Sequence, residues 1–557
     1  MTKPSPSPAR RRSVWKRVFA IASATLAVLL IALGITSIYL WRHVQPFLRA
    51  RLVDTLANRL HAHVDLDQFQ SSASLRHGFA VTGGGLRITP HGLEAYPPVI
   101  QVDHFAFHMD ISQLFNAQRH VRTVEVDGLN LMLPPKAQRK DMFHGAVDQP
   151  EPPPADTSKH TTHLALYFDQ VLATHSTLTL QTDKPNHPPL VFDISSLSLV
   201  SRWGTGKLHY IADLRNPKPT GDIHAEGDFG PWVAEQPRST NITGDYAFNH
   251  ADLATTKGIT GILNSTGHFS GPLEHLTVDG RADVPDFSVE EARHKVALFT
   301  TYHAIVDGTN GDTYLQPVEA HFRNTWFTCA GKVVRAPEGG HDIQLQVKMP
   351  RGRMEDLLWL AVKTPTPIIA GNVVMNTAFQ LPPDPSHSLT VMRRLGLTGK
   401  ITIAQMHFTN PETDRKLDSI SLRTQGDVKQ AQQLSKGAGP DDVSLDGHLT
   451  GDFTLAHGTL QLSAAKFQLP GLQADLHGSY NLPGESFDFT GDVRLEATVS
   501  QMFTGWKSLL LKPADRLFKK NGAGTFLPFH LSGTKDSPEI GIEVAGHTLE
   551  VHPKHRD

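Results

Sequence analysis

Apolar and polar residues alternate along most of the chain. In one clear stretch of the C-terminal third, Val443, Leu445, Leu449, Phe453 and Leu455 share one phase, and Ser, Asp, His and Thr residues occupy the other. A period of two predicts β-strands with one apolar face and one face in water, as in antiparallel sheets. Short connections that contain glycine separate these stretches, so we expect neighbouring strands to pair as a meander.

The apolar phase of these strands supplies the candidate residues for one continuous face. The alternation recurs around 276–284, 343–349 and 472–499. Glycines inside several of these stretches predict bends or bulges, and therefore a long, strongly curved sheet. The candidates for the lining of this face are Leu276, Val278, Ile343, Leu345, Val347, Leu445, Leu449, Phe453, Leu455, Leu476, Phe487, Phe489, Val493 and Leu495.

An apolar sheet face needs a cover, because water against it costs about 25 cal/mol per Å². A second sheet would make a sandwich, which is the commonest solution. Closure of the sheet would make a barrel. A sheet that stays open would need an apolar ligand along its face. The alternation alone leaves these three alternatives open.

One segment near the N-terminus is long and apolar enough to cross a bilayer. Residues 18–40 carry no charge, and about 20 apolar residues suffice to span the hydrocarbon layer. Basic residues precede it, so the positive-inside rule predicts a cytoplasmic tail over 1–17 and an exported remainder. A cleaved signal peptide is the alternative, but the segment is longer than a usual signal core. The proposed anchor includes Trp15, Val18, Leu29, Leu30, Leu40 and Trp41.

A short amphipathic helix is expected directly after this segment. Pro46 can begin it, and leucines at 48, 52, 56 and 60 form its apolar stripe. It could lie on the bilayer surface or plug one end of the β structure. Together with the first strands it makes a predicted segment over 41–133.

The rest of the chain divides at two polar stretches. Residues 134–162 are rich in proline and predict a disordered loop, and 430–442 predict a flexible one. We expect a central β-sheet over 163–429 and a final β region over 443–557. Short helices are predicted inside these segments, at 111–118, 354–362 and 503–520.

Composition and motifs exclude several classes of function. The net charge of −2 gives no bulk basic field for nucleic acid, and the single cysteine, Cys329, makes neither an intramolecular disulfide nor a cysteine-based metal site. Its phase predicts an inward, packed thiol. The stretch HAHVDLD (61–67) is the nearest to a metal motif, but the polar face of a first strand explains it equally. The stretch DGTNGDT (307–313) predicts a tight turn. We therefore predict no catalytic residues, no metal and no cofactor.

Several stretches carry a resemblance to a known family. They are RLHAHVDLDQFQSS (59–72), GFAVTGGGLRITP (78–90) followed by HVRTVEVDGLNLMLP (120–134), 265–289, and NGAGTFLPFHLSGTKDSPEIGIEV (521–544) with its PF–GT–P run. In this order, after a basic stub and one span, the chain resembles the AsmA-like family of bacterial envelope proteins, which is related to bridge-like lipid-transfer proteins. The resemblance covers about 500 residues.

The resemblance implies a mainly β protein: a single transmembrane helix, then a long, curved, groove-like antiparallel sheet with a few short amphipathic helices. It implies a single-pass inner-membrane protein with a cytoplasmic N-terminus and most of the chain in the periplasm. Its partners would be phospholipids, the inner membrane and an outer-membrane or periplasmic protein. The implied function is non-catalytic movement of lipid between the two membranes. The alternative is an assembly factor for outer-membrane biogenesis, with a closed sandwich that docks proteins.

Overall fold

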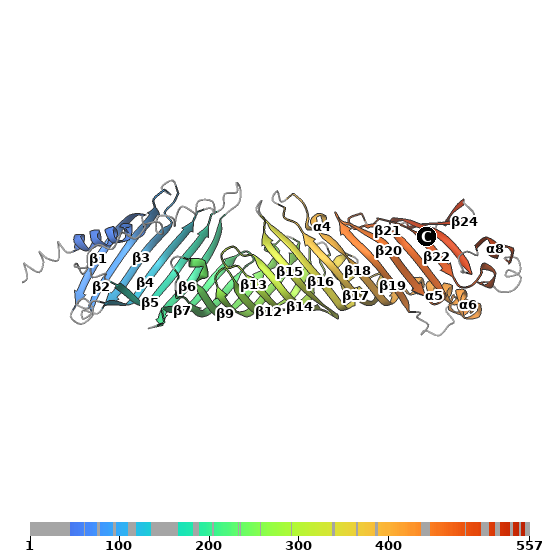
Figure 1. Cartoon of the computed structure of the whole chain (residues 1–557), viewed down its shortest axis with the longest axis horizontal. Coiled ribbons are helices and arrows are strands. Elements are labelled where there is room, and N and C mark those ends of the chain that lie inside the picture. Colours follow the sequence, from blue (N-terminus) through green and yellow to red (C-terminus); the bar gives the residue numbers. More distant parts are fainter. Residues whose placement is uncertain are drawn as a thin grey trace, which may run out of the picture. The chain divides into compact units, whose positions relative to one another are not determined.

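The structure, a computed structural model, is mainly β. It describes residues 45–551 except 59, 61, 75–77, 93–95, 110–117, 135–164, 182–188, 203–204, 232, 234–235, 257, 291, 337–339, 364–365, 385–387, 436–445, 485, 503–511, 519–523, 535–537 and 545–546. The chain divides into two units, Met1–Ser201 and Arg202–Asp557. Both are built on open sheets with few helices, and each is described by itself (Figure 1).

Unit 1 contains the strands β1 to β6, of which only the last residue of β6 lies beyond the unit boundary. Their bounds are β1 (Ala62–Ser74), β2 (Gly78–Pro90), β3 (Ile100–Met109), β4 (Gln118–Leu133), β5 (Ala165–Leu180) and β6 (Leu190–Arg202). Neighbours in sequence are neighbours in the sheet. The expected antiparallel meander is wrong at one place, because β4 and β5 pair in parallel. A parallel pair needs a crossover instead of a hairpin, and the long connection between these strands permits one.

A helix over residues 45–58 covers one end of the unit 1 sheet. Its side chains of Val53, Leu56 and Ala57 pack against a buried cluster of Ala62, Val64 and Ile88. The amphipathic pattern predicted this helix, and the contacts match the plug, one of its two possible placements. The blue helix of Figure 1 lies beside these strands.

Unit 2 is a longer meander. Its strands are β7 (Lys207–Pro217), β8 (Thr220–Phe229), β9 (Asn241–Asp252), β10 (Ile259–Thr260), β11 (Ile262–Pro272), β12 (Leu276–Val289), β13 (Val296–Val306), β14 (Thr313–Phe322), β15 (Thr325–Arg335), β16 (His341–Arg353), β17 (Ile369–Leu381), β18 (Gly396–Phe408), β19 (Gly447–Ala456), β20 (Thr459–Leu469), β21 (Leu472–Asn481), β22 (Ser486–Leu495), β23 (Thr525–Thr534), β24 (Pro538–Val544) and β25 (His547–Val551). All pairs between successive strands are antiparallel, and β10 is a short addition that pairs with β12.

The connections of unit 2 define two long edges of the sheet. One edge, the α3 edge, carries the β7–β8, β12–β13, β14–β15, β16–β17 and β18–β19 connections. It is named for α3 (Met354–Ala361), which joins β16 to β17. The opposite α4 edge carries α4 (Val391–Arg394) between β17 and β18. The other described helices of the unit, α5 (Pro411–Thr424), α6 (Val428–Ser435) and α8 (Asp515–Phe518), follow strands that end at the α3 edge.

The helix predictions are confirmed in part. Helix α3 matches the prediction for 354–362. Of the predicted helix 503–520, the structure describes a 3₁₀ turn at Lys512–Ala514 and α8. The predicted loop 430–442 is wrong where it overlaps α6, and α5 was not predicted. Both helices depend on each other, because Leu422 of α5 packs with Ala431 and Leu434 of α6.

Other sequence predictions lie outside the described residues. These are the cytoplasmic tail 1–17, the predicted span 18–40 with its anchor residues, the helix at 111–118 apart from Gln118, and the loop 134–162 apart from Pro134. Gln118 begins β4. Among the helices that the structure describes, none has the length and apolar character needed to cross a membrane.

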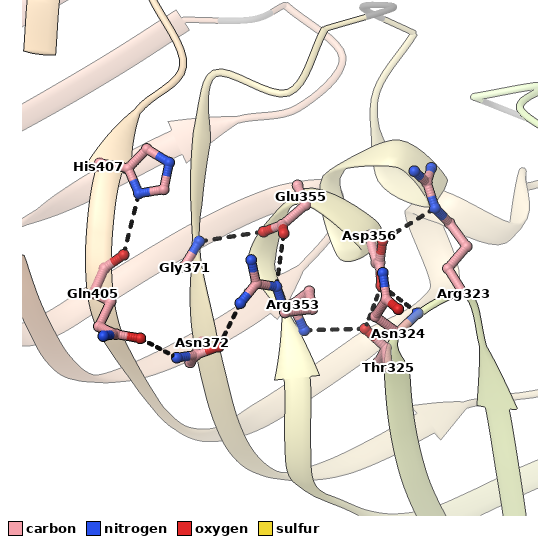
Figure 2. A network of polar contacts seen from close by, with 10 residues as sticks. All are labelled: Arg323, Asn324, Thr325, Arg353, Glu355, Asp356, Gly371, Asn372, Gln405 and His407. Carbon is pink, nitrogen blue, oxygen red and sulfur yellow. Dashed lines mark hydrogen bonds and ion pairs between the residues drawn. The ribbon is translucent and has the colours of Figure 1, made fainter. Parts of the chain in front are cut away.

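A buried carboxylate fixes α3 to the rim of the sheet. Asp356 is 1% exposed and accepts hydrogen bonds from the backbone N–H of Asn324 and from Thr325 Oγ1, both at 3.0 Å. Arg323 Nε lies 3.1 Å from the same carboxylate. Since Arg323 to Thr325 belong to the β14–β15 turn, this carboxylate ties the helix to a turn two strands away (Figure 2).

A second set of contacts ties the start of α3 to β17 and β18. Arg353 donates to Glu355 Oε1 at 2.7 Å and to Asn372 Oδ1 at 2.6 Å, and Asn372 donates to Gln405 Oε1 at 2.6 Å. Glu355 also accepts from the N–H of Gly371 at 3.2 Å. Partial burial alone would raise the pKa of Glu355, but the hydrogen bonds from backbone N–H groups and Arg353 outweigh it and lower the pKa.

We expect Asp356→Ala to lower the free energy of unfolding of unit 2 by about 3 kcal/mol, because two donors lose a charged acceptor at a buried site. Urea denaturation of the full chain, followed by tryptophan fluorescence, measures this loss. Lys416→Ala is the control, since it removes an exposed pair with Glu412 and should change stability by less than about 0.5 kcal/mol. Equal effects of the two variants would contradict the anchoring role of Asp356.

Candidate functional site

The strand register of unit 2 places apolar residues and glycines opposite one another on one face, here called the inner face. One row of paired residues runs through Val318, Cys329, Val347, Thr377, Gly399, Phe453, Leu462, Gly478, Phe489 and Leu531. The row crosses from β14 to β23 with one hydroxyl and no charge. Because paired residues of antiparallel strands share a face, the inner face is apolar from strand to strand.

The opposite, outer face is polar. The row next to the one above runs through Thr328, Lys348, Asn376, Lys400 and Asp452. Lys400 Nζ lies 3.5 Å from Asp452 Oδ1. The outer face is therefore the water-facing side of the sheet.

Histidine and aspartate alternate on the outer face between β9 and β13. Asp245, His268, Asp279 and His303 are successive partners in the register. His268 Nδ1 lies 2.9 Å from Asp245 Oδ1, and His303 Nδ1 lies 2.6 Å from Asp279 Oδ1. These exposed pairs explain part of the high histidine content without a ligand.

The sequence-predicted lining residues lie together on the inner face. The register places there Leu276, Val278, Ile343, Leu345, Val347, Leu449, Phe453, Leu455, Leu476, Phe487, Phe489, Val493 and Leu495. Leu445 lies outside the described residues. Alternation alone found this set, because period two is the period of the strand itself.

Most of these residues are only half-buried. Phe453, Leu455 and Leu495 are buried, while Val278, Val347, Leu476 and Phe489 are intermediate. Two buried clusters in the described part of unit 2 lie near the α3 edge, one under Met354 and Leu357 of α3 and one under Leu417 of α5. Outside these clusters the described strands form no second sheet over the inner face, although single residues such as Val318 and Thr377 are buried. This face is therefore an apolar trough with local cover.

Aromatic rings lie directly over glycines in the floor of this trough. Tyr302 is the partner of Gly280, and a Cβ atom added to Gly280 would lie 2.7 Å from its ring. Gly267 likewise pairs with Tyr246, and Gly491 pairs with Phe529. In both cases an added Cβ atom would lie 2.9 Å from the partner's ring. Small residues under flat rings let the sheet bend toward the inner face, which gives the curvature that in-strand glycine predicted.

A chain of hydroxyl groups crosses the floor between β9 and β13. The Tyr246 and Tyr302 hydroxyls are hydrogen-bonded, Tyr302 Oη lies 2.8 Å from Ser265 Oγ, and Ser265 Oγ donates to the carbonyl of Arg281 at 3.0 Å. If Tyr246 donates to Tyr302 and Tyr302 donates to Ser265, every hydroxyl donor of this chain is used. The sequence did not predict this row of hydroxyl groups. The one sequence feature that indicates it is the presence of tyrosine and serine at apolar positions of the alternation.

Burial keeps the phenols of this region neutral. It raises the pKa of Tyr210 to about 12, with Asp228 and Asp245 adding to the effect. Burial also raises the pKa of Tyr302, and its bond to Ser265 opposes this only in part. Both phenols therefore stay neutral well above the pH at which a free tyrosine ionises.

The stretches that could have held chemistry are explained by local structure. Cys329 is half-buried on the inner face, and burial raises the pKa of its thiol. The stretch 307–313 forms the β13–β14 turn, in which Asp307 accepts from the backbone N–H of Thr309 at 2.8 Å. His63 lies 3.4 Å from Asp65 at an exposed site, and His61 is not described. Among the described residues, no group of three acidic, histidine or cysteine side chains could hold a metal ion.

Gly280→Ala should destabilise unit 2 by about 2 kcal/mol, because the new methyl group meets a tyrosine ring that the hydroxyl chain holds in place. Gly396→Ala is the matched control. Its nearest atom would lie 3.7 Å away, so we expect a small gain of about 0.5 kcal/mol from lower chain entropy. Thermal unfolding of both variants measures the difference, and equal midpoints would argue against the ring-over-glycine packing.

We also expect loss of stability at alkaline pH. A phenol whose pKa is raised in the folded state stabilises the fold below its unfolded pKa of about 10, and the gain disappears as the pH rises through about 12. Absorbance at 295 nm should show late-ionising tyrosines in the folded protein. Tyr210→Phe should remove one of them and reduce the alkaline loss of stability. Ionisation of every tyrosine near pH 10 in the native state would contradict this.

Comparison with protein-family models, with curated proteins and with solved structures finds no match to the chain. We therefore infer a function from the chemistry of the two faces of the unit 2 sheet.

Proposed function

We propose that the chain is a membrane-anchored, non-catalytic carrier that shields phospholipid acyl chains in the trough of unit 2. The observation that carries the proposal is the inner face itself, which is apolar across the paired strands while most of its candidate lining residues are half-buried. Exposed apolar area costs about 25 cal/mol per Å² in water, so an apolar occupant is favoured. Acyl chains fit a surface with no charge and with its hydroxyl donors already used.

The cellular setting of the proposal comes from the sequence. The apolar segment 18–40 would anchor the chain in the inner membrane, and the AsmA-like resemblance suggests the periplasm and transfer of lipid toward the outer membrane. A passive mechanism suffices, in which acyl chains slide along the inner face while headgroups stay in water at the opening. A protein partner at the outer membrane belongs to the same proposal.

The alternative of a closed, protein-docking sandwich needs a second layer over the inner face. In the described residues of unit 2, buried clusters lie under α3 and α5, and single buried residues such as Val318, Thr377 and Phe453 stand among half-buried ones on the same face. This favours the carrier over the sandwich.

The test compares adjacent residues on opposite faces. Val347 lies on the inner face and is half-buried, and Lys348 points to the outer face and is exposed. A photoreactive benzoylphenylalanine at 347 in the full chain, irradiated in cells, should form a phospholipid adduct visible by mass spectrometry. The same group at 348 should not. Equal labelling at both positions, or no lipid at 347, would refute the proposal.

Charge in the trough should block transfer without unfolding the sheet. We expect Val347→Glu combined with Leu462→Glu to reduce lipid movement strongly, since both positions are half-buried and belong to the same inner row. Phe453 and Leu495 are less suitable because they are buried. Lys348→Glu is the control. Retained transfer in the folded double variant would show that the inner face is not the path.

A further inference from the structure

Two parts of unit 2 that belong to opposite edges of the sheet touch each other. Gly258 lies beside β10, and its carbonyl and N–H both bond to Glu290 in the β12–β13 connection of the α3 edge. A Cβ atom added to Gly258 would lie 2.8 Å from Cγ2 and 3.2 Å from Cβ of Val391, the first residue of α4 on the opposite edge. Gly258 and Val391 are therefore in van der Waals contact.

This contact is called the bridge here. β10 continues the ladder of β11 along β12, since Thr260 pairs with Ser288 and Asn264 with Asp283, so Gly258 lies at the α3-edge end of that strand. Since antiparallel strands β12 to β17 run between the two edges, the bridge spans the opening of the trough over these strands.

The α3 edge of the same section is capped. Trp359 of α3 stacks on His294 of the β12–β13 connection with ring centroids 4.2 Å apart, and His294 Nδ1 bonds to the Trp359 carbonyl at 2.8 Å. Arg323 lies over the same indole at 5.0 Å. The helix therefore reaches back from β16 to the end of β12. The section from β12 to β17 has a floor, a capped edge and a bridge over its opening.

We propose that this bridged section is an enclosed binding site for acyl chains, which enter lengthwise along the trough and not sideways through its opening. The inference rests on the proposed function and adds where a chain is held. Its lining includes Val318, Cys329, Val347 and Thr377, which are one row of the inner face. No charged side chain belongs to this row, so the headgroup would stay outside the bridge.

Cys329 makes the section directly measurable, because it is the only cysteine of the chain and lies in the middle of the lining. The experiment uses membranes that contain the full chain, broken so that reagents reach both sides. The rate of reaction with a polyethylene-glycol maleimide is divided by the rate with N-ethylmaleimide at the same thiol. This ratio cancels the raised pKa of Cys329, which slows both reagents equally.

The matched control is Cys329→Ser with Thr328→Cys, which moves the thiol by one residue to the outer face. We expect the ratio at Cys329 to be about tenfold lower than at 328, because the bulky reagent needs a local opening of the bridge. Equal ratios at the two positions would overturn the enclosed site.

Val391→Gly removes the side chain that Gly258 contacts and should raise the ratio at Cys329 several-fold, with no change at position 328. An unchanged ratio in this variant would show that the bridge does not restrict access and would also overturn the proposal.

The experiments distinguish failure of the enclosed site from failure of the proposed carrier function. Exclusion of the bulky reagent without a lipid adduct at 347 would keep an enclosed site and reject acyl chains as its occupant. A lipid adduct at 347 without exclusion would keep the carrier and reject the enclosure.

Discussion

The structure of unit 2 depends on one unmet requirement, the burial of an apolar sheet face. A single layer of strands has no other sheet to pack against, and among the described helices α3 and α5 pack on buried clusters near the α3 edge. The protein reduces the exposed area by bending the sheet toward its inner face, and Tyr302 over Gly280 is one point where this bend is built. What remains uncovered is a surface that water disfavours and an acyl chain does not.

The polar groups on the inner face follow from the same requirement. Tyr246, Tyr302 and Ser265 would each lose solvation there, and they recover hydrogen bonds by bonding to one another and to the backbone of Arg281. At the rim, Asp356 is charged and buried, so it collects donors from the β14–β15 turn and thereby holds α3 in place. Polar contacts thus position the helix that caps the bridged section.

Local pattern and tertiary structure contributed differently to the helices and connections. The strong stripe after Pro46 and the leucines of 354–362 predicted helices that the structure contains. The segment 411–435 is polar overall, so it looked like sheet and loop, but Leu422 and Leu434 pack against each other and make α5 and α6 stable as a pair. The parallel pairing of β4 and β5 depended likewise on the path of a long connection, which carries no periodic signal.

The sequence by itself determined which residues share a face, because alternation is a property of the strand and survives any arrangement of the sheet. That is why the described lining candidates, from Leu276 to Leu495, all lie on the inner face. Only the tertiary structure decided whether that face is covered, since cover depends on how far the sheet curls and on which distant segments meet. The contact of Gly258 with Val391 joins residues more than a hundred positions apart, and the type of neither residue predicts it.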